Sequence, residues 1–271
     1  MTATTHEIAI EADRVVKTFR SWDRDEHRRE WAGLTLLHEC DPGLAPQPLS
    51  RREPGGRPAV VMSRIPGTPL GGRPLTPGQV AGVAEAMNRL HTAVPRGGLD
   101  RLPSRLWGVA DAVKGLRDVY GPSLPGGAEP TTSRAVDEAR RWLACDEPDR
   151  LARDAGQHRV FAQADGNLGN FLWDGERCRL VDFEDSGLSD RAYEIADLVE
   201  HVSVTLTGLF EADDLVDRLD LSPALVHRVR QMRRLYATFW LYMLLPGNRG
   251  HHRNPPGSVE RQAERTLALL A

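Results

Sequence analysis

The sequence has few cysteines, no long apolar run and little net charge, and each absence argues against a class of protein. Its three cysteines, Cys40, Cys145 and Cys178, are far apart and odd in number, so neither a disulfide framework nor a cysteine metal site is expected. The longest strongly apolar run, residues 239–245, is far too short to cross a bilayer. A formal net charge of −3 gives no reason to expect nucleic-acid binding. We therefore expect neither a membrane nor a nucleic acid as partner.

The first residues lack the apolar stretch of a secretory signal, which makes the cytoplasm the expected compartment. Lysine is also scarce, since only Lys17 and Lys114 occur among 35 basic residues. Lys17 lies in a strand-like apolar run, where a compact ammonium suits a phosphate contact that is too tight for a guanidinium. The alternative is an edge-strand lysine whose stem covers apolar surface while its charge stays in water.

Three polar residues, Asp165, Asn170 and Asp182, interrupt the apolar runs of residues 160–184. Asp174-Gly175 is a turn signal between two short apolar segments, and it predicts a hairpin. The hairpin would bring Asn170, before its first strand, close to Asp182, after its second. Converging oxygen ligands suit Mg²⁺, which fills its other positions with phosphate and water. A further carboxylate beside them, Asp165, can accept a proton from a substrate hydroxyl.

This stretch resembles the aminoglycoside phosphotransferase family, part of the protein-kinase-like superfamily. The family's catalytic loop reads roughly His-Gly-Asp-x-His-x-Gly-Asn, and a hairpin and a second Asp follow it. Asp165 and Asn170 stand at the Asp and Asn of that loop, and Asp182 stands at the second Asp. Gln163 and Asn167 replace the two histidines. The resemblance implies that Asp165 is the catalytic base and that Asn170 and Asp182 hold Mg²⁺.

The resemblance also implies a nucleotide site in the first part of the chain. In the superfamily a strand lysine pairs with a helix glutamate and contacts the nucleotide phosphates. Lys17 and Glu30 match that order, because Glu30 lies in a helical pattern over residues 23–39. The alternative is that Glu30 is one more surface charge.

Residues 42–58 are rich in proline and glycine and are expected to form a loop. The apolar strand that follows them ends in a Pro-Gly turn, as the family's hinge does. The resemblance places Met62 at the back of the adenine pocket. It gives the backbone contacts with the adenine edge to Ser63, Arg64 and Ile65. A plain strand and turn is the alternative.

The chain departs from the superfamily in its glycine-rich loop, which normally covers the phosphates. No glycine occurs before Gly33, and only sixteen residues precede Lys17, so we expect either that this loop is absent or that the short N-terminal segment replaces it. The charge is unevenly distributed as well. Residues 182–220 hold twelve acids against two arginines, whereas residues 222–271 hold eight arginines against two acids. Solvated helix faces and an acidic wall beside a substrate cleft both fit this pattern.

We predict an α+β, two-lobed protein-kinase-like fold. Residues 1–63 are expected to form the nucleotide-binding lobe, residues 64–75 a hinge, and residues 76–271 the catalytic and substrate lobe. The predicted reaction is ATP-dependent phosphoryl transfer, with Mg²⁺, to a hydroxyl of a small molecule such as an aminoglycoside or another antibiotic. The alternatives are a nucleotide-binding regulatory pseudokinase and a kinase of a metabolite such as choline, a sugar or homoserine.

Overall fold

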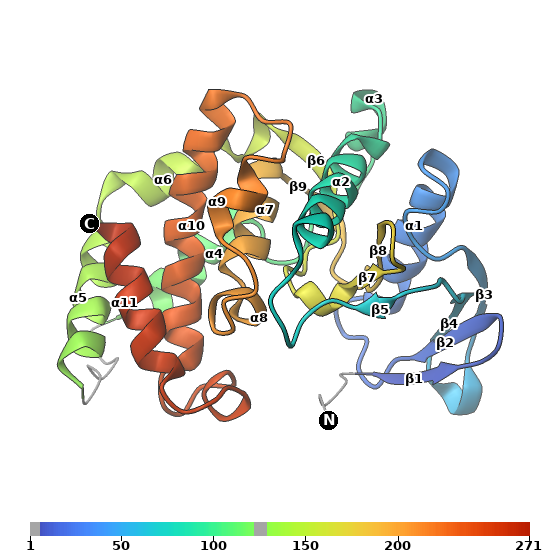
Figure 1. Ribbon diagram of the computed structural model, residues 1–271, viewed down its shortest axis with the longest axis horizontal. Coiled ribbons are helices and arrows are strands. Elements are labelled where there is room, and N and C mark those ends of the chain that lie inside the picture. Colours follow the sequence, from blue (N-terminus) through green and yellow to red (C-terminus); the bar gives the residue numbers. More distant parts are fainter. Residues whose placement is uncertain (1–5, 122–128) are drawn as a thin grey trace.

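The computed structural model describes residues 6–121 and 129–271, and it has a small sheet-containing part and a larger, mainly helical part (Figure 1). The small part is an antiparallel sheet in the order β1-β2-β4-β3, with helix α1 packed against β3 and β4. Its elements are β1 (Glu7–Ile10), β2 (Arg14–Thr18), α1 (Glu26–Cys40), β3 (Pro48–Arg52) and β4 (Ala59–Ser63). This arrangement confirms the predicted two-lobed α+β fold.

The helix predicted over residues 23–39 is observed as α1, and its apolar side chains face the core of this small part. Leu34 and Leu37 are fully buried between α1 and the sheet. Trp31 lies at the margin, and its ring packs under the guanidinium of Arg51 at 5.4 Å. Helix α1 therefore has a fixed orientation on the sheet, and this orientation positions Glu30 on its inner side, where it is completely buried.

The prediction that residues 42–58 form only a loop is wrong, because this segment contains strand β3. β3 pairs with β4 through a register irregularity between Pro48 and Ser50. Proline is tolerated on an edge strand, where the missing N–H is not needed, so its presence did not prevent pairing here. The strand forms because β4 offers a free edge, which is a tertiary effect that local composition does not reveal.

The larger part begins with helix α2 (Pro77–Ala93), which starts at a capping box. The Thr76 hydroxyl accepts from the Gln79 N–H, and the Gln79 side chain accepts from the Thr76 N–H at 3.0 Å. Helices α7 and α11 pack against α10, and α5 packs against α11 (Figure 1). The helices after α2 are α3 (Arg96–Leu99), α4 (Val109–Val119), α5 (Pro130–Ala144), α6 (Asp146–Arg153), α7 (Arg191–Glu200), α8 (Val202–Thr205), α9 (Ala212–Val216), α10 (Pro223–Leu244) and α11 (Ser258–Leu270).

None of the helices formed by the described residues combines the length and apolar character needed to cross a bilayer.

Short strands lie between the sheet and the helices. The strand β5 (Thr68–Pro69) pairs with β7, and β6 pairs with β9. The bounds of the other strands here are β6 (Arg159–Ala162), β7 (Phe171–Trp173), β8 (Cys178–Leu180) and β9 (Gly187–Asp190).

The predicted hairpin is confirmed by β7 and β8, which pair antiparallel from Phe171 opposite Leu180. The carboxylate of Asp174 accepts from the N–H groups of Glu176 and Arg177, both at 2.9 Å, and so closes the turn. Asn170 directly precedes β7, and Asp182 follows two residues after β8. The hairpin thus brings both residues to its open end.

Some of the acids clustered in residues 182–220 form ion pairs with arginines of the C-terminal helices. Asp190 caps α7 and also lies 3.0 Å from Nε of Arg228. Glu200 is completely buried and pairs with Arg233 and Arg265. The solvated-face interpretation fits residues 211–220, whose carboxylates are exposed. Asp190 and Glu200 instead neutralise arginines from the last part of the chain, whereas Glu194 and Asp197 pair with Arg105, and neither interpretation anticipated these buried pairs.

Candidate active site

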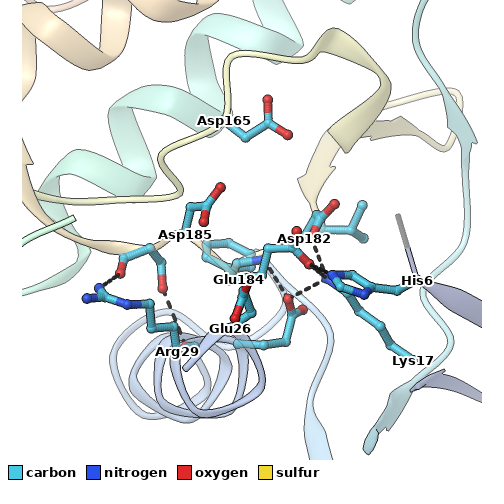
Figure 2. A network of polar contacts seen from close by, with 12 residues as sticks. His6, Lys17, Glu26, Arg29, Asp165, Asp182, Glu184 and Asp185 are labelled. Carbon is cyan, nitrogen blue, oxygen red and sulfur yellow. Dashed lines mark hydrogen bonds and ion pairs between the residues drawn. The ribbon is translucent and has the colours of Figure 1, made fainter. Parts of the chain in front are cut away.

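Lys17 is the centre of a buried cluster of charges. Its Nζ lies 2.9 Å from Oε2 of Glu30, 2.5 Å from Oδ1 of Asp182 and 2.7 Å from Oε2 of Glu184 (Figure 2). Burial disfavours the ammonium, but the three carboxylates together raise the pKa of Lys17 well above its usual range. The strand–helix pair of Lys17 and Glu30 is therefore formed, and the Lys17 side chain is only 6% exposed.

Asp182 is held at the start of a sharp change in chain direction. The Val181 N–H donates to the Asn170 carbonyl at 3.0 Å, and Asp182 then adopts a left-handed φ of 70°. The next N–H, that of Phe183, donates to Oε2 of Glu30 at 3.0 Å. Burial, with Glu30 and Glu184 close by, raises the pKa of Asp182 despite its ion pair with Lys17. The backbone thus points this carboxylate at the lysine.

Sequence analysis did not assign His6 or Glu184 to the site. Nε2 of His6 lies 2.8 Å from Oε2 of Glu184, and the His6 ring packs on Phe19 with centroids 4.6 Å apart. Although burial opposes ionisation, hydrogen bonds from His6 and Lys17 lower the pKa of Glu184 to about 2. The spacing of Glu184 from Asp182 was a usable signal. His6 had none, because its contact with the hairpin spans most of the chain.

Asp165 stands apart from the ion-paired cluster and lies above it in Figure 2. Its Oδ1 accepts from the Asn167 N–H at 3.0 Å, and its Oδ2 accepts from Nδ2 of Asn170 at 2.9 Å. These two bonds fix the orientation of the carboxylate while its side chain remains partly exposed. The carboxylate can therefore receive a further hydrogen bond from a hydroxyl group that approaches from solvent.

The loop of residues 163–170, the predicted catalytic loop, is braced without the histidines of the family pattern. The side-chain amide of Gln163 donates to the carbonyl of Val181 and so ties the loop to the residue before Asp182. On the other side, the guanidinium of Arg105 donates to the carbonyl of Ala164 at 3.1 Å. Ala164 has a left-handed φ of 71°, which is unusual for a residue with a side chain. Gln163 thus fixes the loop at the position where the family has histidine.

Asp185 adds another carboxylate next to the catalytic loop (Figure 2). Burial raises its pKa to about 6, and the negative charges of Glu184, Asp165 and Asp182 act in the same direction. The guanidinium of Arg24, whose Nη1 lies 3.5 Å from Oδ1 of Asp185, acts in the opposite direction and lowers the pKa. Because Asp165 contributes to the shift, it lies within electrostatic reach of Asp185. Asp185 was not among the predicted site residues, since no motif position marks it.

The donor atoms here suit a hard divalent cation. Oxygen atoms of Glu30, Asp182 and Glu184 lie within 4.8 Å of one another, and the Lys17 ammonium is bound by all three carboxylates. Nδ2 of Asn170 is used by Asp165, which leaves its carbonyl oxygen as an acceptor. Carboxylate and amide oxygens are the ligands that Mg²⁺ takes, together with phosphate and water. Asn170 and Asp182, the residues predicted to hold Mg²⁺, thus carry donor atoms of the right kind, and both lie at the open end of the hairpin.

The predicted hinge residues lie at the end of β4 and after it. Met62 is 5% exposed. The Ser63 N–H donates to the carbonyl of Gln47 at 2.8 Å, and the Arg64 N–H donates to that of Asp13 at 2.9 Å. In the part of the chain that the structure describes, the Ile65 N–H has no partner. Of the three backbone donors expected to face adenine, two are thus already used within the protein.

We compared the chain with protein families and with solved structures. Residues 5–230 match the sequence model described as the phosphotransferase enzyme family. No curated protein matches the chain. Among solved structures, a choline/ethanolamine kinase family protein from Mesorhizobium loti is 19% identical with a TM-score of 0.67, covering 100% of this chain and 86% of that one.

Two further solved structures have a similar fold. The aminoglycoside phosphotransferase APH(4)-Ia is 17% identical with a TM-score of 0.65, covering 100% of this chain and 91% of its own. Spectinomycin phosphotransferase APH(9)-Ia, solved with ADP and spectinomycin, is 12% identical with a TM-score of 0.61. The match covers 99% of this chain and 90% of that one. At these identities the likeness establishes the kinase-like fold.

Proposed function

Because the chain belongs to the phosphotransferase enzyme family, we propose that it transfers the γ-phosphoryl group of ATP to a hydroxyl group of a small molecule. The observation that carries this proposal is the buried ion pair of Lys17 with Glu30 and Asp182 beside the braced loop that presents Asp165. ADP in a solved structure of similar fold supports ATP as the donor.

In the proposed reaction each residue has one task. Lys17, oriented by Glu30, binds the phosphates of ATP. Asn170 and Asp182 hold Mg²⁺, which neutralises charge on the phosphates when bound. Asp165 orients the acceptor hydroxyl and takes its proton as the oxygen attacks phosphorus.

The nucleotide would lie between the two lobes, residues 1–63 and 76–271, which the hinge of residues 64–75 connects. At the adenine end, Met62 would line the pocket. The unused Ile65 N–H is the expected donor, whereas Ser63 and Arg64 can offer only their carbonyls. The ATP donor and the three free cysteines support the cytoplasm as the compartment.

The acceptor is a hydroxylated small molecule, and two classes are candidates. Similar folds are found in aminoglycoside phosphotransferases and in a choline/ethanolamine kinase family protein. Asp165, Asn170 and Asp182 stand at the motif positions of the family, and Gln163 braces their loop, so an active enzyme is favoured over a regulatory pseudokinase. Measuring ATP consumption with Mg²⁺ across aminoglycosides, choline, sugars and homoserine would identify the class.

The test of the mechanism is Asp165→Asn. We expect the variant to bind nucleotide normally and to lose turnover by about 10²–10⁴-fold, because that is what a general base typically supplies. Asp214→Asn, which changes an exposed carboxylate on α9, is the matched control and should keep full turnover. Near-normal turnover of Asp165→Asn with an established substrate would show that Asp165 is not the base.

A further inference from the structure

A groove on the helical part, separate from Lys17 and its carboxylates, is lined by basic side chains. It has a volume of about 540 Å³ and lies where the end of α2 and helix α3 meet the chain entering β6 (Figure 1). The described residues that line it include no carboxylate, and its basic members are His91, Arg96, His158, Arg159 and Arg191. Apolar side chains such as Val94 and Leu225 complete the lining.

Several hydrogen-bonding groups in this groove are buried without partners. His91 is only 7% exposed, and neither of its ring nitrogens has a partner among the described residues. Nε of Arg191 is likewise buried and unpaired, although its Nη2 donates to Asn88 at 2.9 Å. An unsatisfied buried donor costs free energy, and native structures rarely leave one without a reason. A ligand with acceptor atoms would satisfy Nε of Arg191 and the ring N–H of His91.

The charge of the groove remains positive after its neighbours are counted. Arg159 is paired with Asp100 at 2.7 Å, and Asp220 exerts a partial attraction on Arg191. Arg96 is exposed and has no ion pair within residues 6–121 and 129–271. Burial, followed by the charge of Arg191, lowers the pKa of His91 to about 3, so at neutral pH this ring is neutral and offers one N–H.

We propose that this groove is a second ligand site, which binds a small oxyanion attached to an apolar body. Guanidinium groups match carboxylate and phosphate oxygens geometrically, so Arg191 and Arg96 would bind the head group together with the N–H of His91. The apolar lining would cover the rest of the ligand. The site is distinct from the proposed phosphoryl-transfer centre, although His91 also lines a small cavity next to Gln163 and Asp165.

The test is calorimetric titration with phenyl phosphate, benzoate and the neutral benzyl alcohol at constant ionic strength. Saturating ADP and Mg²⁺ occupy the nucleotide site throughout. We expect saturable binding of at least one anion and none of the alcohol. Tighter binding of phenyl phosphate would identify phosphate as the head group, and tighter binding of benzoate would identify carboxylate.

Three variants locate the binding. Arg191→Gln should weaken it by about tenfold or more, because a hydrogen bond to a charged group is lost. Arg96→Gln, whose side chain is exposed, should weaken it several-fold and carries the test if Arg191→Gln does not fold. Arg134→Gln on α5 is an exposed, charge-matched control and should stay within about twofold. Absence of saturable binding, or equal binding by all variants, would overturn the proposal.

Discussion

At the scale of single residues, the site depends on one ammonium shared among three carboxylates. Glu30 is completely buried, and its Oε2 is satisfied only by Lys17 and the Phe183 N–H among the described residues. Asp182 and Glu184 retain some contact with solvent. Removing the lysine would therefore leave at least one buried charge without compensation, which is far more costly than the loss of an exposed ion pair.

Lys17→Met should cost about 3–5 kcal/mol of unfolding free energy, because it leaves Glu30 buried and unpaired. It should also nearly abolish nucleotide binding. Lys17→Arg should restore part of the stability but little affinity, since a guanidinium fork does not fit a site shaped for a point charge. Lys114→Met is the control, because Lys114 is the other lysine of the chain and is exposed. Chemical denaturation and nucleotide calorimetry measure both effects.

Tight ATP binding by Lys17→Met would show that another group binds the phosphates. The turn between β1 and β2, residues 11–13, contains no glycine, so backbone N–H groups of a flexible glycine loop are not available there. This makes Lys17 the main phosphate ligand of the small lobe in our proposal.

Asp185 gives a prediction for pH dependence. Its folded pKa of about 6 is above its usual value of 3.8, so its ionisation destabilises the fold at neutral pH, and this penalty is relieved as the pH falls. Asp185→Asn should raise the unfolding free energy by about 1–3 kcal/mol at pH 8 and by about half as much at pH 5. Denaturation of both proteins from pH 5 to pH 8 checks this. A constant difference across that range would contradict the assigned cause.

The site residues that sequence reasoning found are those that share a short motif or a fixed element order. Asn170 and Asp182 flank one hairpin, and Asp165 accepts from Asn170, so local spacing was sufficient to predict which residues lie near one another. His6 and Arg105 act through contacts that span more than fifty residues, and no periodicity encodes such contacts. Whether each predicted residue has its assigned role is the subject of the experiments above.

At the scale of elements, the catalytic loop is held by close backbone packing against α7. A Cβ atom on Gly166 would collide with the carbonyl of Asp197 and lie 2.8 Å from its Oδ1. Glycine is therefore needed here for space. In contrast, a Cβ on Gly169 would meet the Asn167 side chain at 3.3 Å, a contact that a small movement relieves.

Gly166→Ala should reduce turnover by at least about tenfold and destabilise the fold by about 1–3 kcal/mol, because the loop must move away from α7 and displace Asp165. Gly169→Ala in the same loop is the matched control, and we expect a smaller loss of both. Turnover and denaturation measured on the two variants separate the effects. If both variants behave alike, close contact with Asp197 does not position the loop.

Element prediction succeeded where a segment had its own signal and failed where pairing depended on a distant partner. The hairpin of β7 and β8 formed as predicted, because the Asp174-Gly175 turn is a local interaction. Strand β3 was missed, because the free edge of β4 induces a segment rich in proline and glycine to pair. The domain boundaries stay a prediction.

At the scale of the whole molecule, some acids of residues 182–220 pair with arginines of residues 222–271 within the helical part. Glu200, at the end of α7, accepts from Nε of Arg233 at 2.6 Å and from Nη2 of Arg265 at 2.8 Å. One buried carboxylate thus connects three helices, α7, α10 and α11. The same helix α7 carries Asp197 against the catalytic loop, so its placement affects the site.

Glu200→Gln should therefore destabilise the protein by about 2–4 kcal/mol, because two guanidinium groups then face each other without their common anion. Both arginine side chains keep some exposure, 13% for Arg233 and 30% for Arg265, which moderates the cost because water can solvate them. Glu264→Gln on α11 changes an exposed carboxylate and should alter the unfolding free energy by less than about 0.5 kcal/mol. Denaturation at low and high salt distinguishes the buried pairing from surface charge, since screening affects buried pairs least. Equal stability of the two variants would mean that these helices are held together by apolar packing alone.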